Sequence, residues 1–442
     1  MDGIKTIKVG LLGCGTVGGG VAIVLNENRE DITRRSGCRI EIAKVLLRNA
    51  ADPNEIVRKY GLPVTDRIED IVEDPDIQIV VELMGRIHPA KEYIEAALAH
   101  GKNVVTSNKD LIAEYGEELL GLAGKKGVDF QFEGSVGGGI PIIMPLKNCL
   151  AANRITSIMG IVNGTTNYML TRMEKAKLPY AEALKEAQAL GYAESDPTAD
   201  VEGLDAARKI AILASIAFNM RIGLEDVHVE GIDQLEAIDV QYAADLGYAV
   251  KLLGIAKWYP KYGVSANVYP VMLPVHHPLA SVNDVYNAIY INGDAVGEAM
   301  FLGRGAGRLP TASAVCGDIV DTVRNLLHGA TNRIGCTCYR DKQLCPPDKE
   351  MSPCYIRMQV QDKPGVLAAI AAAFGAQQVS LYNVIQKELP KPGQAEIVVV
   401  TNNISKLSLE LSLQTLRVLP VVDKVCSVLR VEDPRLLQAG QD

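Results

Sequence analysis

Two lysines of this chain stand in sequence settings that could support proton transfer. Lys109 lies in the string TSNKD directly after an apolar segment (103–106), where the carboxyl end of a strand would present it to a ligand. Lys209 stands four residues after Asp205 and just before an apolar helical run (210–218), so the two side chains share a helix face. Burial lowers the pKa of a lysine and a carboxylate raises it, and this balance can leave an amine ready to exchange a proton. From spacing alone, a solvated loop lysine and a surface salt bridge worth under ~1 kcal/mol are the better interpretations.

Acidic residues and glycines lie between and around these lysines. The loop GYAESDPTAD (191–200) is dense in carboxylates and includes Glu194 and Asp200. The string EGSVGGGIP (133–141) leaves main-chain oxygens accessible and permits positive φ, which suits either a hinge or a hard-cation site. Composition does not choose between these two. No cluster of His and Cys in this central region has the spacing of zinc ligands, since His276 and His277 are adjacent and followed by proline.

The element that would position this chemistry is a nucleotide-binding sheet. A continuous apolar strand (6–12) runs into the glycine turn GCGTVG (13–18) and then into an amphipathic stretch from 21 towards 30. Strand, glycine turn and helix in this order form a dinucleotide-binding context, with phosphate at the helix N-terminus. A glycine-rich turn without a ligand is the simpler alternative. The residues expected to contact the cofactor here are Gly13, Gly15, Thr16, Val17 and Gly18.

Strands and helices continue to alternate after this turn. We expect strands at 39–47, 77–83, 103–106 and 128–133, with helices at 89–100 and 110–125. This alternation predicts a Rossmann-type, doubly wound parallel sheet. The second strand ends in Leu47-Arg48-Asn49 without an acid, so Arg48 would favour the 2′-phosphate of NADP over NAD. A solvated surface arginine is the alternative.

Six strings in order resemble the homoserine dehydrogenase family. The strings read LLGCGTVGGGV, TSNKD, FEGSVGGGIPII, GIVNGTTNYML, GYAESDPTADVEGLDAARK and GRGAGRLPTASAV, and the resemblance spans about residues 6–334. The resemblance implies reversible interconversion of L-homoserine and L-aspartate 4-semialdehyde with NAD(P), on the route to threonine, methionine and isoleucine. Reduction of an aldehyde needs a hydride and a proton, and a positioned ammonium group supplies the proton and stabilises the alkoxide.

The resemblance also implies roles for single residues. Lys209 corresponds to the proton donor and acceptor at the substrate hydroxyl, and Lys109 to a second lysine near the nicotinamide and the substrate. The ammonium group of an amino-acid substrate explains the acidic loop. The substrate-binding residues would be Glu194, Asp205 and, on the same loop, Asp200. The further cofactor-binding residues would be Arg48, Thr106, Ser107, Lys109, Glu194 and Gly305. A monovalent cation, usually sodium in the family, would be bound mainly by main-chain oxygens at Glu133, Val136, Gly138 and Ile140.

Composition excludes several classes of protein. The chain has 442 residues, enough for two to four domains, and a net charge of −8 without a basic block, which argues against nucleic acid or an anionic membrane as partner. No apolar run approaches the ~18 residues of a membrane span, and the N-terminus has no signal-peptide core. The nine scattered cysteines fit reduced thiols, so we expect a soluble, cytoplasmic protein. Four lie close together, and their spacing favours unpaired thiols over a metal or redox site: Cys336, Cys338, Cys345 and Cys354.

The C-terminal part predicts a regulatory module beyond a polar linker (336–353). We expect strands at 354–360, 380–386, 396–401 and 422–431, a helix opening at 362–367 and another at 406–416, which is the ferredoxin-like order βαββαβ. The string DKPGVLAAIAAAF resembles the ACT domain, which commonly binds an amino acid and pairs across an oligomer interface. Threonine is a plausible effector, and a purely structural dimerisation module is the alternative.

These observations predict an α/β enzyme in three parts that forms a homodimer or homotetramer. The parts are an NAD(P)-binding Rossmann domain over 1–140, completed by 315–335, an α+β catalytic and oligomerisation domain over 141–314, and an ACT domain over 354–432. A non-catalytic amino-acid sensor on the same fold is the main rival, and the presence of both lysines with Glu194 and Asp205 argues against it. A phosphoglycerate dehydrogenase would need a mid-chain nucleotide motif and a histidine–glutamate pair. An aspartate-semialdehyde dehydrogenase would need a nucleophilic cysteine in a suitable motif.

Overall fold

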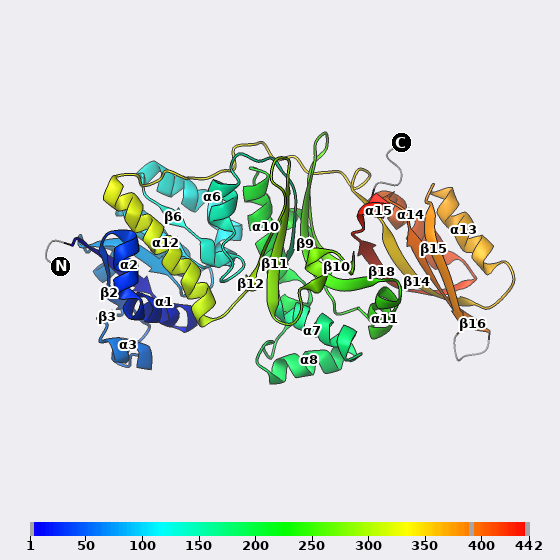
Figure 1. Cartoon of the computed structure of the whole chain (residues 1–442), viewed down its shortest axis with the longest axis horizontal. Helices are drawn as coiled ribbons and strands as arrows, with labels where there is room; N and C mark the ends of the chain where they lie inside the picture. Colours follow the sequence, from blue (N-terminus) through cyan, green and yellow to red (C-terminus); the bar gives the residue numbers. More distant parts are fainter. Residues whose placement is uncertain (1–3, 389–392, 438–442) are drawn as a thin grey trace. The chain divides into compact units, whose positions relative to one another are not determined.

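The computed structural model describes residues 4–388 and 393–437, and the chain divides into two compact units. Unit 1 comprises Met1–Val162, Arg208–Val227 and Asn287–Lys342, and unit 2 comprises Asn163–Ala207, His228–Tyr286 and Gln343–Asp442. Figure 1 follows the elements along the chain, from β1 in blue to α15 in red. Three elements contain residues of both units: β8 (Val227–Val229), α10 (Leu204–Ala217) and β11 (Tyr286–Gly293).

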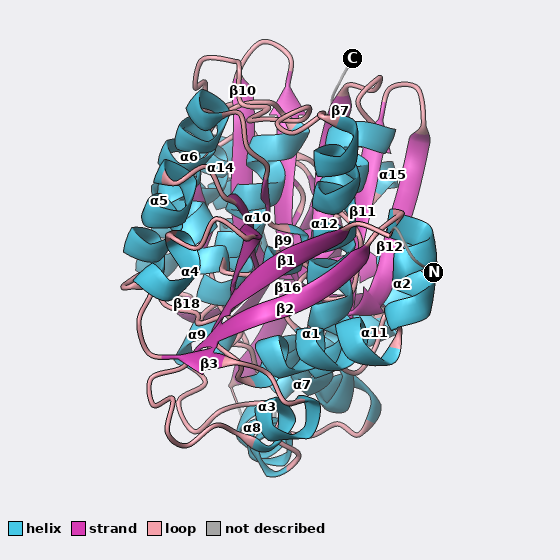
Figure 2. Ribbon diagram, turned by 90° about the vertical axis from the view of Figure 1, so that its left-hand side faces the viewer, coloured by secondary structure: helices cyan, strands magenta, loops and turns pink. Residues whose placement is uncertain are grey.

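A six-stranded parallel sheet forms the nucleotide-binding part of unit 1. Its strand order is β3-β2-β1-β4-β5-β6, which is the expected doubly wound Rossmann order. Figure 2 shows β1 and β2 running side by side, as their parallel pairing requires. The strands are apolar because helices cover both faces of such a sheet. They are β1 (Thr6–Leu12), β2 (Arg39–Leu46), β3 (Val64–Thr65), β4 (Ile77–Glu82), β5 (Asn103–Thr106) and β6 (Phe130–Gln131).

The helices of this part differ from the sequence expectation at two places. The first helix begins at Thr16, not near residue 21, and it ends at Glu27, so that Asn28 separates it from a second short helix. The strand expected at 128–133 is confined to Phe130–Gln131, because the backbone turns into a 3-10 helix at Glu133. The helices are α1 (Thr16–Glu27), α2 (Arg29–Ser36), α3 (Glu55–Tyr60), α4 (Glu69–Val72), α5 (Ala90–Ala99), α6 (Lys109–Lys126) and α12 (Arg308–His328).

Helix α12 returns from far along the chain to pack on this sheet. Its residues Val315, Ile319 and Val323 belong to the same buried cluster as Val9 and Leu11 of β1. Burial of such apolar surface stabilises the fold by roughly 25 cal/mol per Å².

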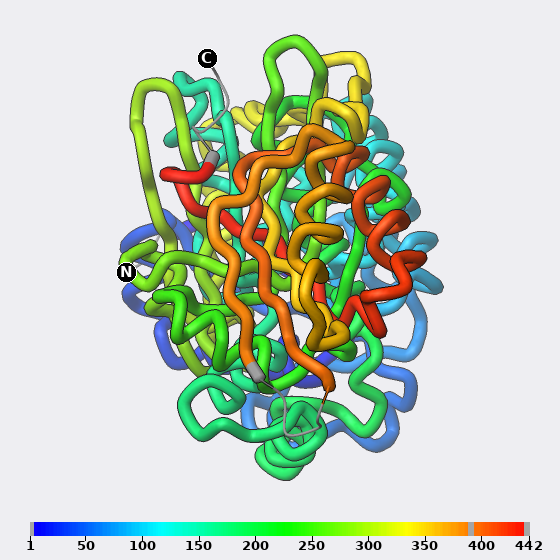
Figure 3. Tube along the Cα trace, turned by 90° about the vertical axis from the view of Figure 1, so that its right-hand side faces the viewer, coloured from blue at the N-terminus to red at the C-terminus, as the bar shows by residue number. Residues whose placement is uncertain are grey.

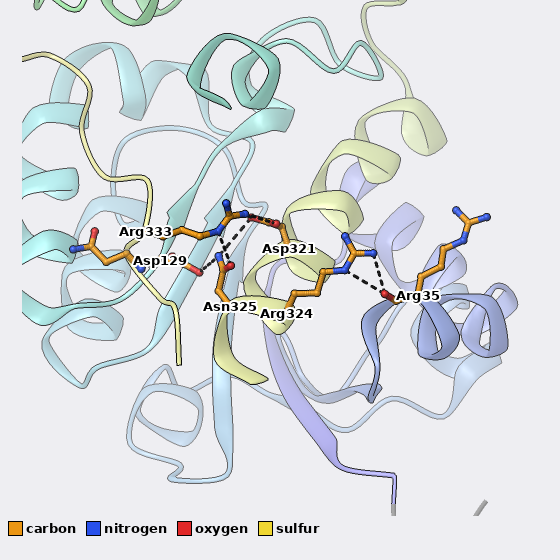
Figure 4. Close-up of polar contacts among 7 residues, drawn as sticks. Arg35, Asp129, Asp321, Arg324, Asn325 and Arg333 are labelled. Carbon is orange, nitrogen blue, oxygen red and sulfur yellow. Dashed lines mark hydrogen bonds and ion pairs between the residues drawn. The ribbon is translucent and has the colours of Figure 1, made fainter. Parts of the chain in front are cut away.

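Polar contacts fix the C-terminal end of α12 (Figure 4). The Asn325 side-chain amide donates to Asp129 Oδ2 at 2.8 Å, and the Arg333 guanidinium donates to Asn325 Oδ1 at 2.8 Å and pairs with Asp321 at 2.9 Å. Arg324 donates to the main-chain oxygen at the end of α2, at Arg35. Burial raises the pKa of Asp129, and the hydrogen bond from Asn325 opposes this shift. The helix is thereby held at both the sheet and its neighbouring helix.

The remaining part of unit 1 is an antiparallel group of strands with short helical turns. Strand β11 pairs with β7, and Ile158 lies opposite Ile291. The elements are β7 (Ile155–Ile161), β12 (Gly297–Arg304), the 3-10 turns η1 (Glu133–Ser135) and η3 (Leu224–Asp226), and the π-helical turn η2 (Pro145–Cys149).

Unit 2 is built on a long antiparallel pair of strands, β9 (Tyr248–Tyr259) and β10 (Gly263–Pro274). All of β10 and most of β9 are buried. The other elements outside the C-terminal part are α7 (Gly164–Lys175), α8 (Tyr180–Ala189), α9 (Thr198–Val201), α11 (Ala237–Asp245) and η4 (Pro278–Ser281).

The C-terminal part of unit 2 has the ferredoxin-like arrangement that the sequence predicts. Its strands lie in the order β18-β14-β16-β15, and Figure 3 shows β15 and β16 in orange with α13 and α14 beside them. The elements are β14 (Cys354–Gln361), α13 (Val366–Ala376), β15 (Leu381–Glu388), β16 (Gln394–Thr401), α14 (Lys406–Val418) and β18 (Val422–Val431). Three short elements flank them: β13 (Met351–Ser352), β17 (Ile404–Ser405) and α15 (Pro434–Leu437).

The ferredoxin-like part shares a sheet with the rest of unit 2. Strand β18 pairs in parallel with β10, with Val271 opposite Arg430. Buried ion pairs accompany this junction: Arg357 of β14 lies 2.6 Å from Asp239 of α11 and 2.8 Å from Glu396 of β16. None of the helices formed by residues 4–388 and 393–437 is long and apolar enough to cross a membrane.

Candidate active site

The glycine turn lies at the carboxyl ends of β1, β2 and β4. Gly13 has φ +92°, and its main-chain N–H donates to the Leu46 oxygen of β2 at 3.1 Å. A Cβ atom on Gly18 would lie 2.2 Å from the Gly13 oxygen, so only glycine lets α1 begin this close to the turn. Gly15 is exposed, and a Cβ there would meet no atom within 4 Å. The turn therefore leaves open space at the N-terminus of α1, which Thr16 and Val17 begin, as a phosphate would require.

Arg48 lies two residues beyond Leu46, the residue that bonds the glycine turn, and its side chain is exposed. The backbone at the end of β2 is thus tied to the turn.

A buried carboxylate that the sequence reasoning missed lies beneath this edge of the sheet. Glu82 ends β4 with no exposed surface, and it accepts hydrogen bonds from the main-chain N–H of Met84 at 2.8 Å and from the Thr106 hydroxyl at 2.7 Å. Burial raises the pKa of Glu82, and these hydrogen bonds oppose the shift. The Thr106 hydroxyl is therefore engaged inside the protein, while Ser107 is partly buried. The acid at the end of the apolar strand IQIVVE was the available signal.

Lys109 is the first residue of α6, and an ion pair links its neighbourhood to Lys209. Asn108 caps the helix by accepting from the Leu111 N–H at 3.1 Å. The next residue after Lys109, Asp110, pairs at 2.6 Å with Arg208, the residue before Lys209. The immediate neighbours of the two lysines thus contact each other within unit 1. Sequence spacing could not predict this ion pair, because Asp110 and Arg208 lie almost a hundred residues apart in the chain.

Lys209 is partly buried on α10, one turn after Asp205. Its Nζ atom donates to the main-chain oxygen of Val162 at 2.7 Å. Val162 directly follows β7, so the amine is directed at the carboxyl end of that strand. The lysine is held in a defined orientation, as a proton-transfer group must be.

Asn163 joins two of the predicted acids. Its side-chain amide donates to Asp200 Oδ1 at 2.7 Å and to Asp205 Oδ2 at 2.9 Å. Its Oδ1 atom accepts from the Thr166 N–H at 2.9 Å and so caps α7. The sequence reasoning quoted the string that contains Asn163 but gave this residue no role. Glu194 is exposed on the same loop as Asp200, and its main-chain oxygen accepts from the Gln188 side chain at 3.1 Å.

The glycine-rich loop at 133–140 is buried and fixed by its own first residue. The Glu133 carboxylate accepts from the main-chain N–H groups of Ile142, Ile143 and Met144. The Glu133 N–H donates to Asp318 Oδ2 of α12 at 2.8 Å. Burial raises the pKa of both carboxyl groups.

Two close approaches bring this loop to the string GRGAG. A Cβ atom on Gly138, whose φ is +55°, would lie 2.4 Å from the Gly305 oxygen. A Cβ atom on Gly305 would overlap the Asn287 side chain, whose buried Oδ1 atom has no hydrogen-bond partner among the described residues. Within the same described part, no hydrogen bond reaches the main-chain oxygens of Val136, Gly138 and Ile140. Unengaged carbonyl oxygens in a buried loop are what a hard cation requires.

Family models match most of the chain. The NAD-binding domain of homoserine dehydrogenase matches residues 13–133, the homoserine dehydrogenase model matches 141–320, and the ACT domain matches 355–421. With the Rossmann order of the first sheet, these matches define an NAD(P)-dependent oxidoreductase that carries an ACT domain.

Full-length relatives make the assignment narrower. Homoserine dehydrogenase from Bacillus subtilis is 44% identical, over 97% of this chain and 99% of its own length, and that from Neisseria gonorrhoeae is 42% identical over the same shares. The crystal structure of a homoserine dehydrogenase from Thiobacillus denitrificans has a TM-score of 0.92 and 40% identity, covering 98% of this chain and 100% of that one. The chain belongs to the homoserine dehydrogenase family.

The predicted fold, family and reaction are thereby confirmed, and the non-catalytic sensor is not favoured. A hyperthermophilic archaeal homoserine dehydrogenase solved in complex with NADPH matches 72% of this chain with a TM-score of 0.61 and 28% identity.

Within residues 4–388 and 393–437, no group of three or more His, Cys, Asp or Glu side chains is arranged to hold a metal ion.

Proposed function

We propose that this chain interconverts L-homoserine and L-aspartate 4-semialdehyde with Lys209 as the proton donor and acceptor at the substrate oxygen. The observation that carries this role is the hydrogen bond from Lys209 Nζ to the Val162 oxygen, one helical turn from Asp205. It gives the amine a fixed direction beside a carboxylate that Asn163 also orients.

Lys209 acts on the oxygen at which charge develops. The nicotinamide ring of the dinucleotide, when bound, would supply or accept the hydride. In the reducing direction the Lys209 ammonium gives its proton to the oxygen as negative charge grows there, and its positive charge stabilises that oxygen beforehand. In the oxidising direction the neutral amine takes the hydroxyl proton. The ion pair between Asp110 and Arg208 joins the start of α6 to the residue before Lys209. It thereby fixes the position of Lys109, the first residue of α6, relative to the Lys209 amine.

The acidic residues bind the amino-acid end of the substrate in this proposal. Asn163 donates to one oxygen of each carboxylate, which leaves Asp200 and Asp205 facing the same amide. Two carboxylates held together attract the substrate ammonium group strongly, since each contact is charge-assisted. Glu194, on the same loop, completes this set and approaches the cofactor.

The glycine turn and its surroundings fit a nicotinamide dinucleotide. The open side of Gly15 and the N-terminus of α1 would hold the pyrophosphate, and Arg48 would bind the 2′-phosphate, which favours NADP. Thr106, Ser107, Lys109 and Gly305 would lie along the nicotinamide half. The unpartnered Asn287 Oδ1 atom beside Gly305 supports a hydrogen-bond donor from the cofactor in this place.

A monovalent cation, sodium, fits the buried loop. Its ligands would be main-chain oxygens at Glu133, Val136, Gly138 and Ile140, three of which accept no hydrogen bond within the described residues. The bound cation would fix the loop that packs against Gly305.

The remaining assignments concern organisation. We assign the NAD(P)-binding domain to 1–140 with 315–335, the catalytic and oligomerisation domain to 141–314, the linker to 336–353 and the ACT domain to 354–432. We propose a homodimer or homotetramer and an amino-acid effector, threonine, at the ACT domain. All nine cysteines are free thiols, which fits a reducing compartment, the cytoplasm.

The test is homoserine-dependent reduction of NADP and of NAD by the wild type and by Lys209→Ala. We expect clear activity in the wild type and a loss of about 100-fold or more in the variant, the effect of one proton-transfer group. Lys185→Ala, which removes an exposed lysine of α8, is the matched control and should keep full activity. Full activity in Lys209→Ala would assign the proton-transfer role to Lys109 instead. A wild type that is inactive with both cofactors would favour the alternative interpretation, a non-catalytic amino-acid sensor.

A further inference from the structure

Two cysteines with one residue between them line a pocket of unit 1 together with two cationic side chains. Cys336 is exposed and Cys338 is partly buried, on the irregular segment that follows α12. Apolar side chains, most of them from α6 and α10, line the pocket together with two cationic side chains. The lining residues include Ile112, Phe132, Lys147, Ile212, Ile216 and Arg221.

The two thiols are electrostatically unlike each other. The Cys338 side chain and, to a smaller extent, its main-chain N–H stabilise the Cys336 anion, and the nearby charges of Lys147 and Arg221 act in the same direction. Together these influences, the Cys338 side chain foremost, outweigh burial and lower the pKa of Cys336 to about 6. The neighbouring Cys336 side chain and burial raise the pKa of Cys338, whose thiol donates to the Ser215 oxygen at 3.6 Å. Cys336 therefore loses its proton more readily than Cys338.

The cations and the segment are fixed in place before any reaction. Arg221 donates to the main-chain oxygens of Ile112 and Ala113 at 3.2 Å, and Lys147 Nζ lies 5.3 Å from the centre of the Phe132 ring. The segment itself is anchored, since the Arg340 N–H donates to the Asn219 oxygen at 2.9 Å.

Other cysteines of the chain lack this setting. Burial raises the pKa of Cys345 and of Cys354 to about 11 and that of Cys316 to about 12. Reactivity of a cysteine follows its thiolate fraction and its exposure. The exposed Cys336 therefore stands apart from these three.

We propose that Cys336 and Cys338 form a reversible oxidation site, in which Cys336 is the nucleophile towards hydroperoxides and Cys338 is the resolving thiol. The spacing alone favours unpaired thiols, but the structure places both thiols in the lining of one pocket, together with the fixed cations Lys147 and Arg221. Three cysteine or acidic ligands gathered for a metal ion are not found among the described residues.

The chemistry proceeds in two balanced steps. The Cys336 thiolate attacks one oxygen of the hydroperoxide, the O–O bond breaks, and the leaving alkoxide takes a proton from water, so that Cys336 becomes a sulfenic acid and the hydroperoxide an alcohol. Cys338 then loses its proton, its sulfur bonds to the Cys336 sulfur, and the S–O bond breaks to release water. A disulfide across a single intervening residue closes a small ring, and strained disulfides are the ones that thiols reduce readily.

The experiment uses the full-length chain, reduced, freed of reductant and exposed to a small excess of hydrogen peroxide. We expect a mass loss of about 2 Da, the disappearance of two titratable thiols and a disulfide peptide that links Cys336 to Cys338, all reversed by dithiothreitol. Cys338→Ser should stop at the sulfenic acid, which a 1,3-dione traps at Cys336. Cys345→Ser is the matched control and should oxidise like the wild type.

A second measurement does not depend on the disulfide. At pH 6.5, iodoacetamide should alkylate Cys336 about tenfold or more faster than Cys345, because most of Cys336 is already ionised. Lys147→Met should slow this reaction. The proposal is overturned if the oxidised peptide lacks Cys336, if Cys336→Ser loses the same two thiols at the wild-type rate, or if Cys336 and Cys345 alkylate alike at pH 6.5.

Discussion

Replacement of Asn163 tests whether the two carboxylates that we propose to bind the substrate, Asp200 and Asp205, depend on the amide that joins them. Asn163 makes two hydrogen bonds to carboxylates, at 2.7 and 2.9 Å, and a third contact that caps α7. A hydrogen bond to a charged group contributes about 1.5–3 kcal/mol, and a helix cap about 1 kcal/mol. Alanine removes all three contacts. Serine keeps a cap acceptor but is too short and has no amide to bridge Asp200 and Asp205.

We expect both variants to lose catalysis and stability, and the alanine variant to lose more stability than the serine variant. If the oriented carboxylates contribute the equivalent of one charged hydrogen bond in the transition state, about 2 kcal/mol, then kcat/KM for homoserine falls about 30-fold in Asn163→Ala and in Asn163→Ser. The KM for NADP should stay unchanged, because Asn163 lies on the substrate side. The free energy of unfolding should fall by about 1.5–3 kcal/mol in both variants through the lost charged hydrogen bonds, and by about 1 kcal/mol more in Asn163→Ala, which also loses the cap.

The assays are initial rates at varied homoserine and urea unfolding followed by circular dichroism. An Asn163→Ser enzyme with kcat/KM within about threefold of the wild type would refute the reasoning, since the bridge would then be dispensable. A fall in kcat/KM that simply tracks the loss of folded protein would refute it as well.

Three further predictions concern the cofactor, the buried loop and a buried lysine. Arg48→Ala should lower the ratio of kcat/KM for NADP to that for NAD about tenfold or more, and an unchanged ratio would leave Arg48 a solvated surface residue. Gly138→Ala should lower the unfolding temperature and the activity, because the new Cβ meets the Gly305 oxygen, whereas Gly121→Ala on α6, where the space is open, should stabilise by about 0.5–1 kcal/mol; equal effects would contradict this. Burial lowers the pKa of Lys251 to about 8 from its ordinary value of 10.5. The unfolded chain therefore binds more protons between these two pH values, and the free energy of unfolding should rise with pH across that window, by up to ~3 kcal/mol, relative to Lys251→Met; parallel pH curves for the two proteins would contradict it.

Much of the fold could be predicted because its strands, turns and helices follow from the residue types of short, continuous segments. An apolar strand followed by glycines at 13, 15 and 18 requires a tight turn and a closely packed helix, and the Cβ clash at Gly18 is the physical form of that requirement. The βαββαβ order of the C-terminal part could likewise be read from its alternating runs. The length of the strand at 128–133 could not, because its end is set by the Glu133 carboxylate reaching three amide groups further along the chain.

The site was less predictable because its contacts join distant residues. The spacing of Asp205 and Lys209 indicated a shared helix face, and yet their defining partners are Asn163 and the Val162 oxygen, more than forty residues earlier. The pair of Asp110 and Arg208 is equally remote in sequence. Such contacts depend on which helix ends the fold brings together, and no periodicity contains that information.

The junction between β18 and β10 determines whether the ACT domain could be cut away from the rest of the chain. Cutting away the ferredoxin-like module would strip one edge of β10 of its partner. It would also remove Arg357, the ion-pair partner of Asp239, and Glu432, which lies 2.6 Å from Lys257. A chain cut before the module should therefore be less stable than the full chain, because it keeps an unpaired strand edge and two charges without their partners. Point substitutions within the module, which leave its backbone in the sheet, are the cleaner way to ask what the module does.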